Sequence, residues 1–331
     1  MSNFRTFSLA VLMASLAWGG SAAAVTATTQ RTFVASTGVD TNPCSRAAPC
    51  RTFGAAEALT SDSGEVIVLD SAGYGPVTIT KSIAIEAPTG VYAGISVFSG
   101  DGITIATPGI SVILRGLTIN GQGGAGGIVM TAGSALTVEN CVITNLTSDG
   151  VQVGGQAQVR IADSRIQSNS GSGLRFIDAG SGVVTRSVID SNYSGITVNT
   201  TGSNATTINI SNVDVVRNDY EGVYFASGAT GAISASIRDS QVSGSSYGVD
   251  VESSGGALVV ASVSGSVISN NDNAFWMAGA NAKVWASGNT ITENFMAVHS
   301  ASGAVFESAG NNAVRNNTAA NVGTVTVVSP Q

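Results

Sequence analysis

The sequence predicts an all-β fold, a parallel β-solenoid, and two observations support this prediction. A polar motif recurs at steps of 23–27 residues, as in residues 164–176 (SRIQSNSGSGLRF) and 187–198 (SVIDSNYSGITV). Within each repeat apolar and polar residues alternate, which is the period of a β-strand with one buried face. No repeat has room for a crossover helix, so each strand is expected to pair with its counterpart one coil away.

The N-terminal segment, residues 1–24, is predicted to be a signal peptide. Arg5 precedes an apolar run that begins at Leu9, and the small residues 22–24 (AAA) form a cleavage pattern before Val25. A membrane anchor is the alternative, but the run is too short to span a bilayer. We therefore expect export to the periplasm, surface or surroundings of a bacterial cell, with no transmembrane segment after cleavage.

Residues 25–65 are predicted to form a head and cap in front of the solenoid. Cys44 and Cys50 lie six residues apart, and in an oxidising compartment they are expected to form a small disulfide loop. The segment TFGAAEALTS has apolar residues at helical spacing, namely Phe53, Ala56 and Leu59. It predicts a short amphipathic helix, which can cover the core and strand edges that an open solenoid end exposes.

Residues 66–323 are predicted to form the solenoid itself, and residues 324–331 a C-terminal tail. Aligning the repeats produces two rows of apolar residues that are expected to point inward. One row comprises Ile166, Ile189, Val215, Val242, Ile268, Ile291 and Val314. The other comprises Val151, Leu174, Ile196, Val223, Val249, Phe275 and Val298.

A recurring asparagine marks the turn of nearly every coil. Its side-chain amide can bond the turn backbone and the asparagine of the next coil, so stacking is expected to produce a structural ladder. Its predicted members are Asn120, Asn145, Asn169, Asn192, Asn218, Asn271, Asn294 and Asn317, with Ser245 replacing asparagine in one coil.

The charge and composition exclude some classes of function. The net charge is −7 and the chain has only two lysines, Lys81 and Lys283. Nucleic acid is therefore excluded as a partner, because its binding depends mainly on phosphate neutralisation. Cysteine and histidine are too few for a transition-metal site, so Cys141 is expected to be a small wall residue. No cofactor is predicted, and calcium at the turns stays open because no ligand set can be named.

The coil pattern resembles that of the pectin-lyase-like superfamily of secreted right-handed parallel β-helix proteins. The segment 33–59 (FVASTGVDTNPCSRAAPCRTFGAAEAL) is similar to the head of many secreted members. This resemblance implies a right-handed solenoid. The superfamily includes pectate lyases, polygalacturonases and alginate epimerases. This sequence lacks the Asp-Asp pair and the Gly-His-Gly of the polygalacturonases, and its one histidine, His299, lies in AVHS.

The outward positions of the repeat indicate where a site would lie. One outward row contains Gln152, Arg175, Thr197, Tyr224, Asp250, Trp276 and His299, and an adjacent row ends at Trp285. Exposed aromatic rings can stack on sugars, which makes Tyr224, Trp276 and Trp285 candidates for ligand binding. The alternative is that they pack under a loop or against another subunit. Both interpretations stay open.

Catalysis is harder to support from this row. Arg175, Asp250 and His299 are the candidate catalytic residues, but stacking places Asp250 and His299 roughly 10 Å apart, too far for a hydrogen-bonded pair. Convergence of carboxylates and arginine in one cleft would favour an enzyme, whereas aromatic and hydroxyl side chains alone would favour binding.

Three hypotheses follow for function. The first is an exported scaffold or polysaccharide-binding protein without an identifiable catalytic motif. The second is a lyase or glycoside hydrolase that acts on an extracellular, uronate-containing polysaccharide. The third is a self-assembling structural or adhesive subunit. The oligomeric state is left open, and the fold alone cannot choose among these functions.

Overall fold

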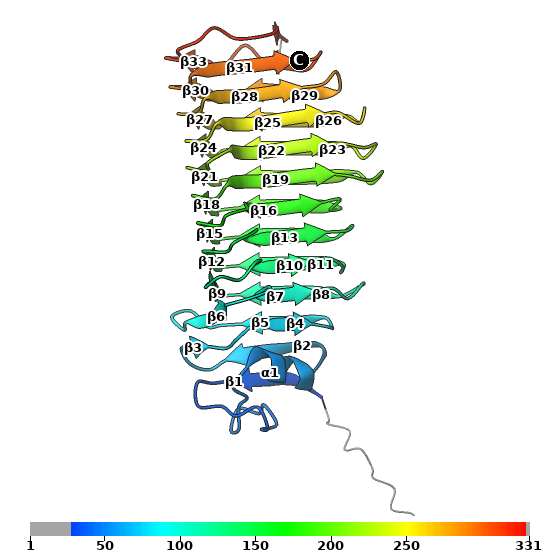
Figure 1. The fold of residues 1–331 in the computed structure, drawn as a ribbon, viewed down its shortest axis with the longest axis vertical. Coiled ribbons are helices and arrows are strands. Elements are labelled where there is room, and N and C mark those ends of the chain that lie inside the picture. Colours follow the sequence, from blue (N-terminus) through cyan, green and yellow to red (C-terminus); the bar gives the residue numbers. More distant parts are fainter. Residues whose placement is uncertain (1–27, 329–331) are drawn as a thin grey trace, which may run out of the picture.

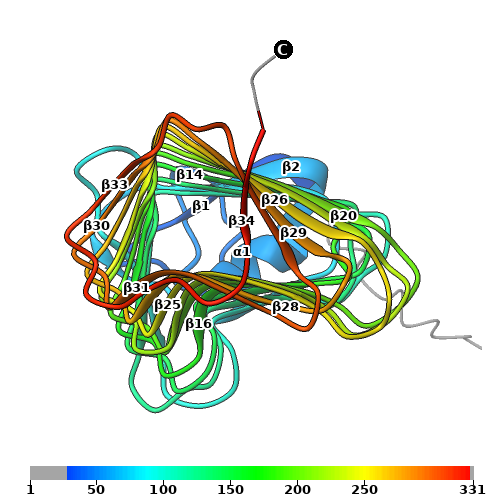
Figure 2. The same ribbon diagram turned by 90° about the horizontal axis from the view of Figure 1, so that it is seen from above.

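The computed structural model describes residues 28–328, which wind into a rod of stacked coils (Figure 1). Three parallel sheets run along the rod, and seen from one end they enclose a single interior (Figure 2). The parallel β-solenoid predicted from the sequence is confirmed. The signal peptide predicted for residues 1–24 lies outside the described residues. No helix in the described part of the chain has the length and apolar character needed to cross a membrane.

Sheet A has 13 strands and includes both ends of the described fold. Its strands, in order, are β1 (Thr29–Val34), β2 (Thr60–Val68), β5 (Ile83–Glu86), β8 (Ser111–Arg115), β11 (Ala135–Glu139), β14 (Gln158–Ala162), β17 (Ser181–Thr185), β20 (Thr206–Ser211), β23 (Ile233–Arg238), β26 (Val259–Ser264), β29 (Ala282–Ser287), β32 (Val305–Ser308) and β34 (Val325–Val327). Strand β34 lies in the segment predicted to be a tail, and by pairing with β32 it extends the sheet.

Sheet B has 11 short strands. They are β3 (Ala72–Gly73), β6 (Ala93–Val97), β9 (Leu117–Gly121), β12 (Val142–Thr144), β15 (Arg165–Gln167), β18 (Val188–Asp190), β21 (Asp214–Val216), β24 (Gln241–Ser243), β27 (Val267–Ser269), β30 (Thr290–Thr292) and β33 (Ala313–Arg315). The first predicted inward row runs through this sheet in register. Its members are buried except Val314, which is 47% exposed because it lies in the last strand of the sheet.

Sheet C has 10 strands and forms the third side of the coil. They are β4 (Val77–Ile79), β7 (Ile103–Ile105), β10 (Ile128–Met130), β13 (Val151–Gly154), β16 (Ser172–Ile177), β19 (Ser194–Thr200), β22 (Glu221–Ser227), β25 (Tyr247–Ser253), β28 (Asn273–Ala278) and β31 (Met296–Ala301). The second predicted inward row lies here in register and is buried throughout.

The head lies at the N-terminal end of the rod (Figure 1). Helix α1 (Phe53–Leu59) follows the N-cap residue Thr52, whose hydroxyl accepts a hydrogen bond from the Ala55 amide. Asp40 fastens the head loop to this helix start, because its carboxylate accepts hydrogen bonds from the Thr52 amide and hydroxyl. Cys44 and Cys50 form the predicted disulfide.

The asparagine ladder begins later in the chain than predicted. Asn169 Nδ2 donates to Asn192 Oδ1 at 2.9 Å, and Asn192 Nδ2 donates to Asn218 Oδ1 at 3.1 Å. Beyond Ser245, which has no amide side chain, the ladder resumes with donations from Asn271 to Asn294 and from Asn294 to Asn317.

Asn120 and Asn145 are not members of this ladder, and their assignment was wrong. Strand pairing aligns Ile143 with Ile166, so the ladder position three residues later holds Leu146. Asn145 instead occupies the preceding left-handed position, with φ of 62°, as Ser168 does in the next coil. Asn120 is a strand residue paired with Thr144, and the two asparagines bond only each other at the surface.

Candidate functional site

The outward row predicted from the repeat exists on sheet C. Strand pairing places its members in one continuous column across seven neighbouring strands. In order along the rod they are Gln152, Arg175, Thr197, Tyr224, Asp250, Trp276 and His299. The strand period and the repeat alignment were sufficient to predict this column.

Trp285 does not share the face of Tyr224 and Trp276, so the predicted aromatic face is corrected. Trp276 lies on β28 of sheet C, whereas Trp285 lies on β29 of sheet A. Those two strands run along different sides of the interior (Figure 2). Because both side chains point outward, the two rings lie on different faces of the rod.

Five rings line up along sheet C in what we call the aromatic column. Tyr193 stacks on Tyr220 with ring centroids 5.6 Å apart, and Tyr220 meets Tyr247 at 5.3 Å. Tyr247 contacts Trp276 at 5.1 Å, and Trp276 contacts His299 at 3.9 Å. The column therefore covers five consecutive coils and remains partly exposed, with Tyr193 at 50%.

The three tyrosines of this column were missed in the sequence. Tyr193 directly follows the ladder residue Asn192, whereas Tyr220 and Tyr247 come two residues after Asn218 and Ser245. They lie where the turn passes into sheet C, and the turn differs in length between coils. An alignment centred on the ladder residue, allowing one inserted residue, would have found them.

A small pocket opens beside the first two rings of the aromatic column, Tyr193 and Tyr220, over β16, β19 and β22. We call it the sheet C pocket, and its volume is about 200 Å³. Tyrosine rings, a cation, an amide and a carboxyl group meet there, contributed by Arg175, Tyr193, Asn199, Tyr220, Glu221 and Tyr224. Apolar walls with a few polar groups are typical of ligand sites.

Two polar atoms of this pocket lack partners. Arg175 Nε and Asn199 Oδ1 are buried and have no hydrogen-bond partner among the described residues. The Arg175 guanidinium lies 3.8 Å from Asp149, whose carboxylate also accepts the Ser172 amide. Buried polar groups are normally satisfied, so an unpaired donor and an unpaired acceptor beside a pocket favour a ligand.

Carboxyl groups gather just beyond the pocket in a carboxyl cluster of Glu221, Asp250 and Glu252. Burial raises the pKa of Asp250 to about 9, and the nearby Glu252 and Glu221 add to this shift. Burial likewise raises the pKa of Glu221, whose carboxylate accepts a hydrogen bond from Ser194. Tyr224 donates to Glu252 at 2.8 Å. Asp250 is thus protonated near neutral pH beside a carboxylate bound by Tyr224.

The three candidate catalytic residues do not converge. Arg175 lines the sheet C pocket, while Asp250 lies three strands further along the rod and is only 3% exposed. Trp276 separates Asp250 from His299 in the column. The carboxylate that shares the pocket with Arg175 is Glu221, which the sequence did not indicate.

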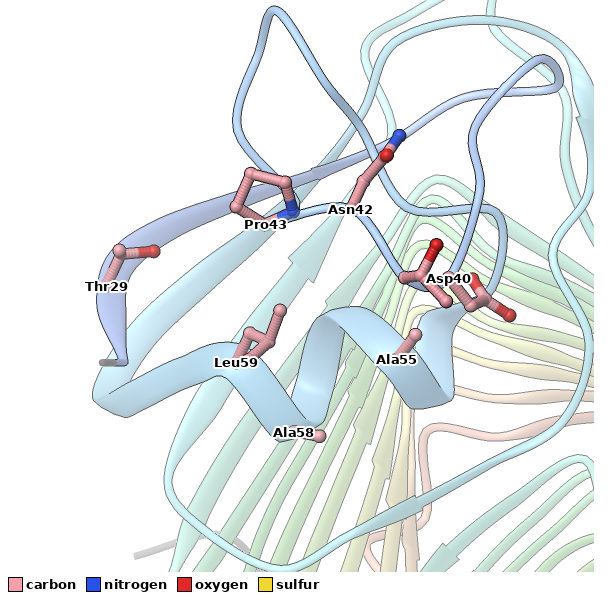
Figure 3. Close-up of a pocket in the computed structure, with 8 residues that line it drawn as sticks. Thr29, Asp40, Asn42, Pro43, Ala55, Ala58 and Leu59 are labelled. Carbon is pink, nitrogen blue, oxygen red and sulfur yellow. The ribbon is translucent and has the colours of Figure 1, made fainter. Parts of the chain in front are cut away.

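A larger cavity of about 840 Å³ lies at the N-terminal end of the rod, between α1 and the head loop (Figure 3). Ala55, Ala58 and Leu59 of the helix face Pro43 across it. Its lining is mostly apolar, and Asp40, the one charged lining residue in the described chain, is already engaged in fastening the helix start. This cavity therefore has the size of a ligand site but few polar groups that could orient a ligand or take part in a reaction.

Within residues 28–328, no group of three or more cysteine, histidine or acidic side chains is placed to hold a metal ion. Cys141 is a buried wall residue, and burial raises the pKa of its thiol to about 11. Its place in the coil is that of Ser164, whose hydroxyl accepts the Cys141 amide. A thiol of this kind is not a nucleophile at neutral pH.

Residues 65–235, just over half of the chain, match the family model described as "Right handed beta helix region". The chain belongs to this family. It is a right-handed parallel β-helix, and its coils continue beyond the matched segment to β34. A comparison with curated protein sequences gives no match.

Solved structures with similar folds include several proteins that act on or bind sugars. A polygalacturonase from Erwinia carotovora ssp. carotovora has a TM-score of 0.63 at 12% identity, and the match covers 85% of this chain and 95% of that chain. XylC, solved with xylose, has a TM-score of 0.61 at 10% identity, covering 80% and 69%. Pectate lyase Pel9A has a TM-score of 0.56 at 14% identity, covering 90% and 78%. At these identities the likeness shows the fold alone.

Proposed function

We propose that this β-helix binds a polysaccharide outside the cytoplasm, along the outer face of sheet C. The observation that supports this proposal is the sheet C pocket, where tyrosine rings, Arg175, Asn199 and Glu221 meet at the end of the aromatic column. Aromatic rings offer apolar area to sugar rings, while the polar groups fix the sugar hydroxyls. A volume of about 200 Å³ suits a small unit such as one sugar residue of a longer chain.

The remaining rings extend this surface along the rod. Tyr247 and Trp276 continue the aromatic column beyond the pocket, on the side of the carboxyl cluster. A polymer that places one residue in the pocket can therefore continue over several coils. The disulfide, the predicted signal peptide and the sugar-related structural neighbours are consistent with a periplasmic or extracellular location.

A second candidate function is hydrolysis of the same polymer, and the carboxyl cluster favours it. Asp250 holds a proton near neutral pH while Glu252 lies nearby, and glycoside hydrolysis uses one protonated and one ionised carboxyl group. In such a step the acid gives its proton to the glycosidic oxygen as the bond to the sugar breaks. The base takes a proton from the attacking water. The burial of Asp250 argues against this role, which places binding first.

A glycan array tests both candidates, with the mature protein beside a Tyr193→Ala, Tyr220→Ala double variant. Trp285→Ala is the matched control, since it removes an exposed ring from sheet A. We expect the double variant to lose about fivefold to tenfold in affinity, the loss of about 1–1.5 kcal/mol expected when aromatic contact is removed. The control should bind like the wild type.

Product analysis on the bound polymers separates the two candidates. New reducing ends would indicate hydrolysis, and ultraviolet absorbance would reveal an unsaturated uronate from a lyase. Binding without either product supports the binding function. Equal loss in the double variant and in Trp285→Ala, or no binding to any polymer, would contradict the proposal.

A further inference from the structure

We infer that the sheet C pocket accepts a neutral, hydroxyl-bearing sugar unit and rejects a uronate. This inference rests on the proposed function and specifies its ligand class. It concerns the residue held in the pocket, and two independent features support it: the unpaired polar atoms, and the balance of charge around them.

The unpaired atoms are complementary to a hydroxyl group. Arg175 Nε is a donor and Asn199 Oδ1 is an acceptor, and both are buried without a partner among the described residues. Both atoms are covered in the ligand-free fold, so the two side chains must turn toward the pocket to meet a ligand. A sugar hydroxyl can accept one hydrogen bond and donate another, so neighbouring hydroxyls can then satisfy both atoms. An ionised carboxylate only accepts, so in the same place it would leave Asn199 Oδ1 unpaired and facing another acceptor.

The charge around the pocket opposes a second carboxylate. Arg175 is the one cation among the lining residues that the structure describes, and Asp149 lies 3.8 Å from its guanidinium. Glu221 lines the same pocket, and Glu252 lies close enough to raise the pKa of the Glu221 carboxyl group further. A uronate would therefore enter a site whose cation is already paired and whose remaining charge is negative. Like charges in a partly buried site repel strongly.

Glu221 is placed to set this preference. It is 6% exposed, and its carboxylate is oriented by the Ser194 hydroxyl. A glutamine at this position keeps the size and can still accept from Ser194, but it removes the charge. Substituting it changes electrostatics with little change of shape, which makes Glu221→Gln the discriminating variant.

The test compares neutral and acidic glycans in matched pairs at pH 7 and low salt. Suitable pairs are oligogalacturonate with its methyl ester, mannuronan with mannan, and glucuronan with glucan oligomers. Where a pair binds, we expect the neutral member to bind at least about tenfold more tightly. The difference should shrink at high salt, which screens charge. Glu221→Gln should improve the binding of acidic members relative to neutral members severalfold, so that the ratio between the two members of a pair narrows.

Glu139→Gln is the matched control, because it removes a carboxylate from sheet A. It should leave both affinities unchanged, and circular dichroism confirms that each variant is folded. Equal or tighter binding of the acidic members overturns this inference while the proposed function stands. No binding by any member of any pair contradicts the proposed function itself. No gain for acidic glycans in Glu221→Gln would show that Glu221 does not set the preference.

Discussion

The outer faces of sheets A and C differ in whether their charged groups are paired. On sheet A, half-buried Arg115 lies between Glu86 and Glu139 on neighbouring strands and donates a hydrogen bond to each. On sheet C, Glu221 and Asp250 are buried, and Glu252 adds a third carboxyl group, with no ion pair to any of the three within residues 28–328. Alternating charges on a solenoid surface need no explanation beyond folding. Ionising such buried carboxyl groups opposes folding, so the sheet C arrangement points to a function.

The pKa values express the same contrast. The hydrogen bond from Arg115 lowers the pKa of Glu139, so folding favours its ionised form. Burial, with help from Glu252 and Glu221, raises the pKa of Asp250 to about 9, so folding favours its protonated form. The two faces should therefore respond to pH with opposite signs.

The largest effect is expected from Asp250→Asn. The folded pKa of Asp250 lies above that of the unfolded chain, so the folded state binds more protons between those values. Stability from this group is complete at low pH and falls from about pH 4 up to about pH 9. The asparagine removes that fall. We expect stabilisation by about 2–4 kcal/mol at pH 7.5 and almost none at pH 4, measured by urea unfolding at both pH values.

Asp163→Asn provides the control for this experiment. Asp163 is an exposed carboxylate that accepts two hydrogen bonds from Arg186, and that contact lowers its pKa. Its contribution is present above its unfolded pKa and lost as the pH falls, so the substitution should weaken stability slightly at pH 7.5. If Asp250→Asn also destabilises the protein at pH 7.5, the carboxyl group is ionised and paired, and the contrast between the faces is lost.

An intermediate effect is expected from Tyr224→Phe. The Tyr224 hydroxyl donates to Glu252 at 2.8 Å, and burial raises the tyrosine pKa. Removing the hydroxyl leaves Glu252 without this donor, which should cost about 1–2 kcal/mol in unfolding free energy. Combining it with Glu252→Gln in a double-mutant cycle measures the coupling. Strictly additive effects would show that Tyr224 does not hold Glu252 in place.

The fold could be predicted from the sequence because one rule repeats in every coil. Apolar residues recur at the Ile166 and Leu174 positions of each repeat. Because these residues pair in register with the next coil, their side chains all point into the interior. The ladder register failed at Asn145 because two neighbouring turn positions both favour asparagine. The alignment matched asparagine with asparagine, whereas the left-handed backbone shows that Asn145 is equivalent to Ser168 of the next coil.

The candidate site was only partly predictable. Strand period places Arg175 and Trp276 outside, but it does not say which sheet a given outward residue belongs to, so Trp285 was assigned to the wrong face. Tyr193, Tyr220 and Tyr247 were not predicted as one column because they follow turns of unequal length. The unpaired atoms of Arg175 and Asn199 depend on what surrounds them in three dimensions, and no pattern in one sequence reports that.

The smallest effect is expected on sheet A, from Arg115→Ala. Arg115 is 42% exposed and bonds Glu86 and Glu139, so water already screens much of the attraction. We expect a loss of about 1 kcal/mol or less in unfolding free energy at low salt, and almost none in 1 M sodium chloride. In the variant, only strand β8 separates the strands of Glu86 and Glu139, and the weak repulsion between these two carboxylates accounts for part of the loss.

Lys283→Ala, on the same sheet, is the control for removing an exposed cation. A loss above about 2 kcal/mol that persists in high salt would mean that the sheet A charges are as structurally important as the buried groups of sheet C, and the contrast between the faces would fail.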